Sequence, residues 1–238
     1  MRKRRLSPLC LFAAGLLALV AGISIAAPAC AATPAARLSD AASVLQEMAQ
    51  QSDVGALARL LKKAKGVVVF PAVIKAGLVV GGRYGEGLLL RHDPRTGLWY
   101  GPHFVTLKGL SYGPQFGFQS TALVLVVAND EGMKGFRGDK VTLGGDVSVA
   151  AGPVGRHAEA STDADLKASI YSYSMSKGIF AGLSLEGAVI APDDDANALY
   201  WHEALQPDQI LARRASGAGV EPLLRELERL MEGKAART

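Results

Sequence analysis

The sequence predicts an α+β fold with a curved, glycine-rich, mostly antiparallel β-sheet or barrel-like core and helices at both ends. Three observations predict this class. Apolar residues recur at helical spacing near both ends of the chain, short β-type runs fill residues 66–191, and no long helices alternate with those runs. A doubly wound parallel sheet requires such alternation, so an antiparallel arrangement is favoured.

Residues 1–32 precede the predicted fold and have the pattern of an export signal. The basic segment MRKRR is followed by the apolar run Leu9–Ala27 and by APACAA, which offers small residues to a signal peptidase. Ala29 and Ala31 fit positions −3 and −1 for cleavage after Ala31, with cleavage after Ala32 as the alternative. A retained membrane helix is a second alternative. We expect an exported protein of the periplasm or cell envelope.

Removing this segment leaves residues 33–238, which are enough for a single domain with a substantial core. Four of the 26 Lys and Arg residues lie in MRKRR, so 22 remain against 22 Asp and Glu. The remaining chain is near neutral, and the pI of 9.1 gives no support for nucleic-acid binding.

Both cysteines, Cys10 and Cys30, also lie in the leader. Cleavage after Ala31 would leave a cysteine-free chain, with neither a disulfide framework nor a thiolate metal site. The alternative is that Cys30 becomes the lipidated first residue of a lipoprotein, although the preceding APA lacks the usual large aliphatic residue.

Residues 33–65 predict two helices. Ser39 is expected to cap the first, whose apolar residues recur at helical spacing. Gly66 stands where a C-cap glycine would end the second helix. The apolar face of that second helix is formed by Val54, Leu57, Leu61 and Ala64.

The β-type runs begin after Gly66 and are separated by turn signals such as HDPRTG and NDEG. Only DEGMKGFRG and TDADLKA are expected to hold a helical turn within this region. Glycine recurs inside the runs, which indicates a tightly curved and closely packed sheet. Helices return at Pro207, which opens PDQILARRA, and in a final leucine-striped segment.

Ser111 lies in a G-x-S-x-G pattern, which is typical of a hydrolase nucleophile. That role requires a helix directly after the serine, but the segment that follows, FQSTALVLVV, is strand-like. His157 and His202 lie downstream without a pattern that would link them to Ser111. We therefore predict a protein that is not an enzyme, with a serine hydrolase as a disfavoured alternative.

No cofactor or metal is predicted. VVGGRYGEG lacks the lysine-serine ending of a phosphate loop and the helix of a dinucleotide fingerprint. The segment PDDDANALYW lacks the spacing of a calcium loop, so its three aspartates are expected in a solvated turn. The four histidines have no ligand spacing.

One electrostatic feature remains in the stretch Val54–Gly85, which contains six cations and no acid. A basic amphipathic helix followed by basic strand residues is a candidate contact for an anionic membrane. The alternative is an ordinary solvated helix face. The six residues are Arg59, Lys62, Lys63, Lys65, Lys75 and Arg83.

Four segments, in order, resemble the SYLF domain family of lipid-binding proteins across residues 40–230. They are AKGVVVFPAVIKAGLVVGGRYGEGLLL, GLWYGPHFVTLKGLSYGPQFGFQ, LGGDVSVAAGPVGR and YSYSMSKGIFAGLSLEGAVIAPDDDANALYW. Eukaryotic members of that family bind phosphoinositides through a basic, amphipathic N-terminal region, and some bind actin. Bacterial members are typically exported single-domain proteins described as lipid-binding.

The resemblance implies a non-catalytic domain that contacts an anionic phospholipid or membrane surface, with the six cations as its lipid-binding residues. Phosphatidylglycerol or cardiolipin is a more reasonable ligand than a phosphoinositide, and actin binding is not expected for an exported protein. Two positions depart from the family: His202 replaces a usual glycine, and Pro114 a common aliphatic residue.

The sequence leaves open how the basic helix would contact a membrane and which of two functions the domain has. Val54, Leu57 and Leu61 cannot both insert into a membrane and pack on the sheet, and a helix with a buried apolar face offers only charge. The alternative function is a structural or interaction module of the cell envelope that binds a protein or a glycan.

Overall fold

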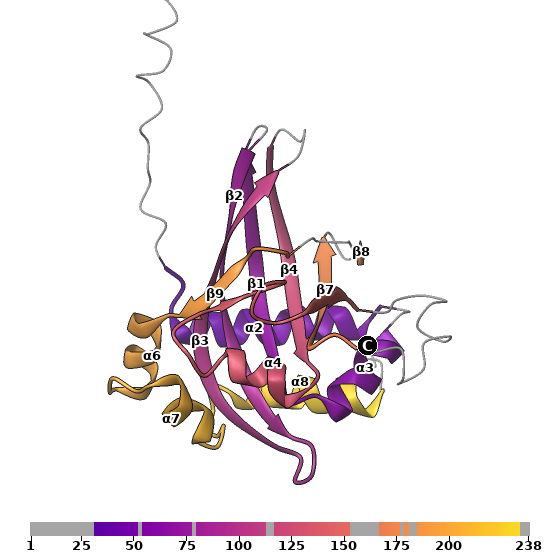
Figure 1. The fold of residues 1–238 in the computed structure, drawn as a ribbon. Coiled ribbons are helices and arrows are strands. Elements are labelled where there is room, and N and C mark those ends of the chain that lie inside the picture. Colours follow the sequence, from indigo (N-terminus) through magenta and orange to yellow (C-terminus); the bar gives the residue numbers. More distant parts are fainter. Residues whose placement is uncertain are drawn as a thin grey trace, which may run out of the picture. The chain divides into compact units, whose positions relative to one another are not determined.

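Four long antiparallel strands form the centre of the fold in the computed structural model (Figure 1). The structure describes residues 31–51, 54–77, 80–112, 117–152, 167–176, 179–180 and 185–233. The spatial order of the central strands is β3-β2-β1-β4, and each pairs with its neighbours over most of its length. Their bounds are Gly66–Gly77 (β1), Val80–Asp93 (β2), Leu98–Tyr112 (β3) and Gly117–Val127 (β4).

Shorter strands extend this sheet on both sides. Beyond β3 lie β9 (Val189–Pro192) and then β5 (Val141–Thr142). Beyond β4 lie β7 (Ile170–Ser176), with β6 (Val149–Ala151) and β8 (Ile179–Phe180) both paired to it. Within the described ranges, only the β6–β7 pairing of named strands is parallel. The predicted α+β class with a curved, mostly antiparallel sheet is confirmed.

Alternation along the strands produces two apolar cores, one on each face of the sheet. Val67 and Val69 of β1 belong to the first core, whereas Val68 and Phe70 belong to the second. Successive strand side chains point to opposite faces, so a strand buried on both sides reads as the continuous apolar run seen in the sequence.

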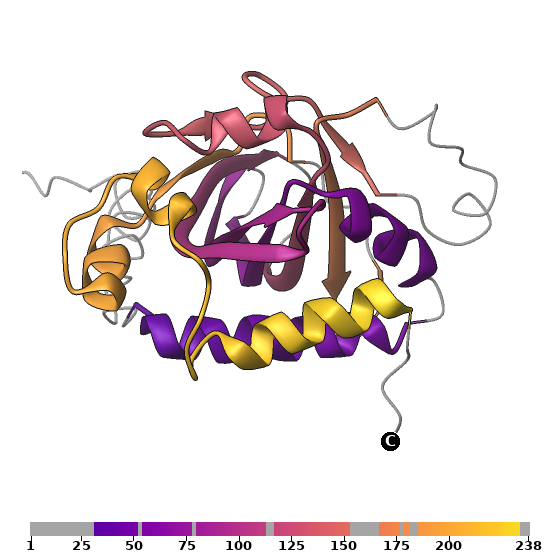
Figure 2. The same ribbon diagram turned by 90° about the horizontal axis from the view of Figure 1, so that it is seen from below.

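Three helices cover the first face, and smaller helices lie against the rest of the sheet. Figure 2 shows two of the three side by side along one side of the curled sheet: α2 (Pro34–Ala49) and α8 (Glu221–Glu232). The third is α3 (Val54–Lys63). The second core includes residues of α4 (Asp130–Gly135) and α7 (Pro207–Ala212), while α6 (Asp194–Trp201) follows β9.

The start of α2 corrects one prediction. Ser39 was expected to be the cap, but it lies inside the helix, and the N-cap is Thr33, whose hydroxyl accepts from the Ala36 N–H. Pro34 follows at the first helical position, where its fixed φ and missing N–H cost nothing. The Thr33–Pro34 pair is therefore the stronger start signal.

The three aspartates correct a second prediction. They do not form a solvated turn, because Asp193 is the N-cap of α6 and Asp194 and Asp195 occupy its first turn. Acidic residues are favourable there, since they complement the positive end of the helix dipole. The helical turn expected in DEGMKGFRG is present as α4, whereas TDADLKA lies almost entirely outside the described residues.

Candidate functional site

The exposed side of α3 carries three of the predicted cations. Arg59, Lys62 and Lys63 are all exposed, and their spacing places them along one stripe of the helix. Lys62 and Lys63 lie in the last turn, where positive charge is favourable beside the helix C-terminus. We call these three residues the α3 stripe.

The opposite side of α3 is packed into the first core. Leu57 and Leu61 are 0% exposed, and Val54 is partly buried against the same core. This answers the question that the sequence left open, because these side chains pack on the domain and are not presented for insertion. Any contact between α3 and a membrane would therefore rest on its charged side chains alone.

Lys65 follows α3 and lies at the edge of a pocket of about 480 Å³. Its Nζ atom is 3.4 Å from an Asp130 carboxylate oxygen. The pocket lies where the end of β2, the start of β1 and α4 meet. Its lining residues are Lys65, Arg91, His92, Asp93, Pro94, Arg95, Asp130, Met133 and Arg137.

One of the pocket arginines, Arg91, is held in place by neighbouring groups. Arg91 donates from Nε to the Leu211 carbonyl oxygen at 2.7 Å, and its guanidinium lies 3.8 Å from the centre of the Tyr100 ring. Arg137 and Arg95 are more exposed, and they form longer ion pairs with Asp208 at 3.5 Å and with Asp93 at 3.8 Å. A fixed guanidinium group such as that of Arg91 loses little side-chain entropy on meeting an anion, which makes it suited to phosphate or carboxylate recognition.

His92 contributes no positive charge to this pocket at neutral pH. Its Nδ1 donates to the Ala64 carbonyl oxygen at 3.0 Å, and its ring stacks on Trp99 with centroids 4.2 Å apart. Burial lowers the pKa of His92. The lining therefore holds four Lys and Arg side chains against two carboxylates.

Lys75 and Arg83 are far from this pocket. They face each other across β1 and β2, near the other end of the sheet. Ten strand residues separate Lys65 from Lys75, which corresponds to roughly 33 Å at the usual strand rise. Burial lowers the pKa of Arg83. The structure thus divides the six predicted residues into two groups.

An exposed apolar cluster, which the sequence did not reveal, lies near Lys75 and Arg83. Ile74 pairs with Tyr84, and Leu110 lies on the same face beside them, with exposures of 36%, 42% and 80%. Lys108, opposite Tyr84, is also exposed. In Figure 1 this end of β1–β4 extends beyond the helices. We call Ile74, Tyr84 and Leu110 the sheet-end patch.

The hydrolase alternative gains no support from the described residues. Ser111 lies within β3, and the next described element is the strand β4, so the strand–turn–helix arrangement of a nucleophile elbow is not seen. The Ser111 side chain, His157 and Pro114 lie outside what the structure describes.

Two other histidines, His103 and His202, differ in their exposure. His103 is buried, and this burial lowers its pKa to about 4, so the ring is neutral at pH 7. His202 is exposed at the end of α6.

Among the described residues, no three His, Cys, Asp or Glu side chains gather as metal ligands would. Those residues also contain no helix long and apolar enough to cross a bilayer.

These features define a mixed α+β domain with a cationic stripe on α3, followed in the chain by Lys65, which lines a pocket with three arginines. Residues 108–230, just over half of the chain, match the family described as Ysc84: Las17-binding protein actin regulator. The chain belongs to this family, which is the SYLF domain family that the sequence resembles.

Three curated relatives show the extent of the similarity. The SH3 domain-containing protein PJ696.02 of Schizosaccharomyces pombe is 39% identical over 173 residues, which cover 71% of this chain and 40% of that protein. LAS seventeen-binding protein 3 of Saccharomyces cerevisiae is 36% identical over 173 residues, covering 71% and 37%. The human SH3 domain-containing YSC84-like protein 1 is 34% identical over 155 residues, covering 65% and 45%.

The match to these relatives therefore spans less than half of their length. The family description and the name of LAS seventeen-binding protein 3 refer to Las17 binding and to actin regulation.

Proposed function

We propose that this protein is an exported, non-catalytic domain that binds anionic phospholipid surfaces through the α3 stripe and the adjoining basic pocket. The observation that carries this proposal is the position of Lys65. It follows the α3 stripe in the chain and lines the pocket that contains Arg91, Arg95 and Arg137. The cations therefore continue from an exposed helix into a hollow that a headgroup could enter.

Electrostatics supports a lipid surface over a single small anion. Each cation near an anionic leaflet contributes about 1 kcal/mol, and the stripe presents three of them together. Guanidinium groups in the pocket would contact phosphate oxygens as paired donors, which lysine ammonium groups cannot do. Phosphatidylglycerol and cardiolipin supply such phosphates in an exported setting.

Vesicle co-sedimentation of the protein purified after export tests this proposal. The test variant changes Arg59, Lys62 and Lys63 to Gln. The matched control changes three other exposed cations to Gln and so alters the net charge equally. These control residues are Lys140, Arg214 and Arg225.

We expect binding to phosphatidylglycerol-containing vesicles but not to neutral phosphatidylcholine vesicles. Loss of the α3 stripe should weaken that binding by roughly tenfold or more, while the control variant stays within about twofold of wild type. Equal loss in both variants would mean that only net charge matters. Failure of the wild type on every vesicle would instead favour a cell-envelope module with a protein or glycan partner.

The names of the relatives raise one further candidate, a protein partner related to Las17 or to actin regulation. We do not expect actin binding, because an exported protein would not meet actin in its own compartment. Pull-down with purified actin in parallel with the vesicle assay would reveal an error in this expectation.

A further inference from the structure

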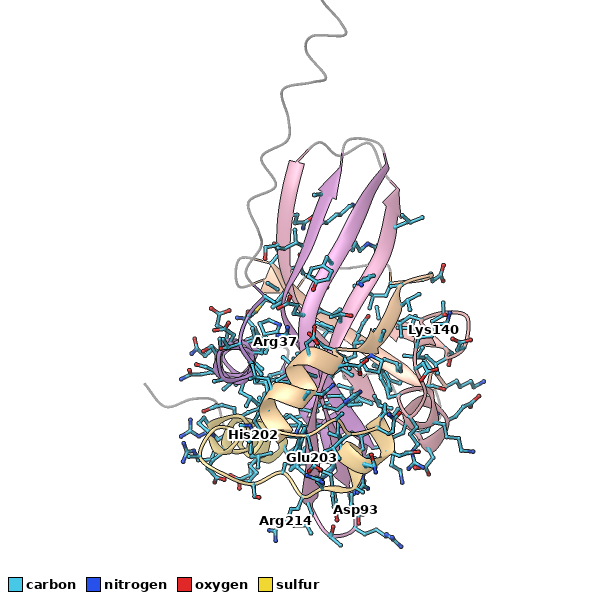
Figure 3. The ribbon with its side chains drawn as sticks, turned by 90° about the vertical axis from the view of Figure 1, so that its left-hand side faces the viewer. Arg37, Asp93, Lys140, His202, Glu203 and Arg214 are labelled. Carbon is cyan, nitrogen blue, oxygen red and sulfur yellow. The ribbon has the colours of Figure 1, made fainter. Side chains whose placement is uncertain are left out.

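Arg37 is a buried arginine that ties three separate segments together. Its side chain is 3% exposed, and it projects from α2 toward the sheet (Figure 3). One terminal nitrogen lies 2.9 Å from Glu86 of β2, and the other lies 2.7 Å from Asp193 at the start of α6. Its Nε donates to the Ala32 carbonyl oxygen at 3.0 Å.

Ala32 is held at its nitrogen as well as at its carbonyl group. The Ala32 N–H donates to one Glu86 carboxylate oxygen at 3.0 Å. The other oxygen of that carboxylate accepts from the Tyr84 hydroxyl at 2.9 Å. Residue 32 is therefore part of the folded domain, although it directly follows the predicted cleavage position.

The charges around Ala32 are unequal. One guanidinium faces two carboxylates, and the side chains of Glu86 and Asp193 are only 17% and 16% exposed. Asp193 also accepts from the Ala196 N–H at the start of α6, where the helix dipole favours a negative charge. Tyr84 remains neutral, because its pKa is raised to about 12, first by burial and then by Glu86. Glu86 thus lacks a full positive partner of its own, and buried charges are normally paired.

We propose that cleavage of the Ala31–Ala32 bond completes this cluster by converting the Ala32 nitrogen into an ammonium beside Glu86. Signal-peptidase hydrolysis adds one water to the bond. The Ala31 carboxylate leaves with the leader, and the released Ala32 amine takes up a proton to become the ammonium. Two positive groups then face two carboxylates.

The contacts of Ala32 also distinguish cleavage after Ala31 from cleavage after Ala32 and from lipidation at Cys30. Cleavage after Ala32 would remove the carbonyl oxygen that accepts from Arg37 Nε, leaving a buried donor without that partner. A lipoprotein that begins at Cys30 would keep the Ala32 nitrogen as a neutral amide. Only cleavage after Ala31 places an ammonium at this position.

Intact-mass analysis of the protein expressed with its own leader, and recovered from the periplasm, is the first test. We expect a chain that begins at Ala32. A chain that begins at Thr33, a lipidated chain that begins at Cys30, or an uncleaved chain would overturn the proposal. This result is independent of any lipid-binding assay.

Thermal unfolding then tests the charge pair itself. At pH 6.5, the Ala32-initiated protein should have a Tm about 2–4 °C higher than the same protein extended by Ala31. In a Glu86→Gln background, which keeps the side chain's shape but removes its charge, the extension should no longer matter. Equal Tm values in the wild-type background, or an undiminished difference in Glu86→Gln, would refute the pairing.

The Tm advantage of the Ala32 ammonium should decrease as the pH rises. An α-amino group has an ordinary pKa of about 7.7–8.0, and Glu86 would raise it in the folded state. The stabilisation is then fully present below the ordinary pKa and is lost as pH rises through the raised value. The Tm advantage should therefore be complete at pH 6.5 and absent at pH 10.5. An advantage that persists at pH 10.5 would contradict an ammonium.

Discussion

At the residue scale, His202 has a backbone conformation that glycine adopts more readily. It ends α6 in the left-handed conformation, with φ of 58°, and is the one non-glycine residue with positive φ in the described ranges. A Cβ atom makes this conformation costly by about 1–2 kcal/mol, whereas glycine adopts it readily. Glycine, which the sequence resemblance implies at this position, would therefore suit the helix end.

We predict that His202→Gly stabilises the protein. Relief of the left-handed strain, less the extra entropy of a glycine in the unfolded chain, should raise the Tm by about 2–4 °C in a thermal melt. His202→Ala is the control, because it removes the same exposed imidazole but keeps the Cβ atom. If alanine gave the same gain as glycine, loss of the imidazole rather than backbone relief would be the cause.

Single residues were predictable from the sequence where their neighbours determine their surroundings. The exposure of the α3 stripe followed from the leucines on the opposite side of the same helix. Arg37 could not be assigned in this way, because Glu86 and Asp193 lie far from it in the chain and meet it only through the fold. Asp193 shows the same limit, since PDDDANALYW alone does not distinguish a helix cap from a turn.

At the element scale, the glycines of β2 have different roles. A Cβ atom on Gly87 would overlap the Val69 carbonyl oxygen and lie 2.5 Å from the Phe70 ring. This close approach occurs beside the irregularity in the β1–β2 register between Val69 and Ala72. A Cβ atom on Gly82, in the same strand, would meet nothing within 4 Å.

Gly87→Ala should therefore destabilise the protein, and Gly82→Ala should not. Forcing a methyl group against the β1 backbone and a buried ring should cost about 1–3 kcal/mol, measured as a lower midpoint of urea unfolding. Gly82→Ala should change the free energy of unfolding by less than about 0.5 kcal/mol. Similar losses in both variants would indicate that glycine in β2 serves a general conformational role.

The helices and strands themselves were largely predictable, because hydrophobic periodicity and the residues typical of turns and helix caps are local signals. Both N-terminal helices, the strand-rich middle and the leucine-striped end occur where the sequence placed them, although Thr33 and not Ser39 begins α2. The strand order was not predictable. That β9 pairs with β3, and β7 with β4, depends on contacts between distant segments that no short pattern records.

At the scale of the whole domain, charge and exposed apolar surface are separated. The α3 stripe lies where the helix leads into β1, and its apolar side is buried. The sheet-end patch lies toward the other end of β1, with Lys75, Arg83 and Lys108 nearby. The family resemblance made the basic helix, from Arg59 to Lys65, the leading lipid contact, with Lys75 and Arg83 next. The fold separates the six cations into two groups, so experiment can assign the proposed membrane contact to one group or the other.

We expect contact through the α3 stripe, and this predicts binding by charge alone. The Debye length shortens from about 10 Å at 0.1 M salt to about 3 Å at 1 M, so binding to anionic vesicles should be almost completely lost over this range. Leu110→Ser should leave binding unchanged at every salt concentration. Because Leu110 is 80% exposed, this substitution should also leave the Tm within about 2 °C of wild type. Binding that resists 1 M salt and disappears in Leu110→Ser would contradict charge-only contact and assign membrane insertion to the sheet-end patch.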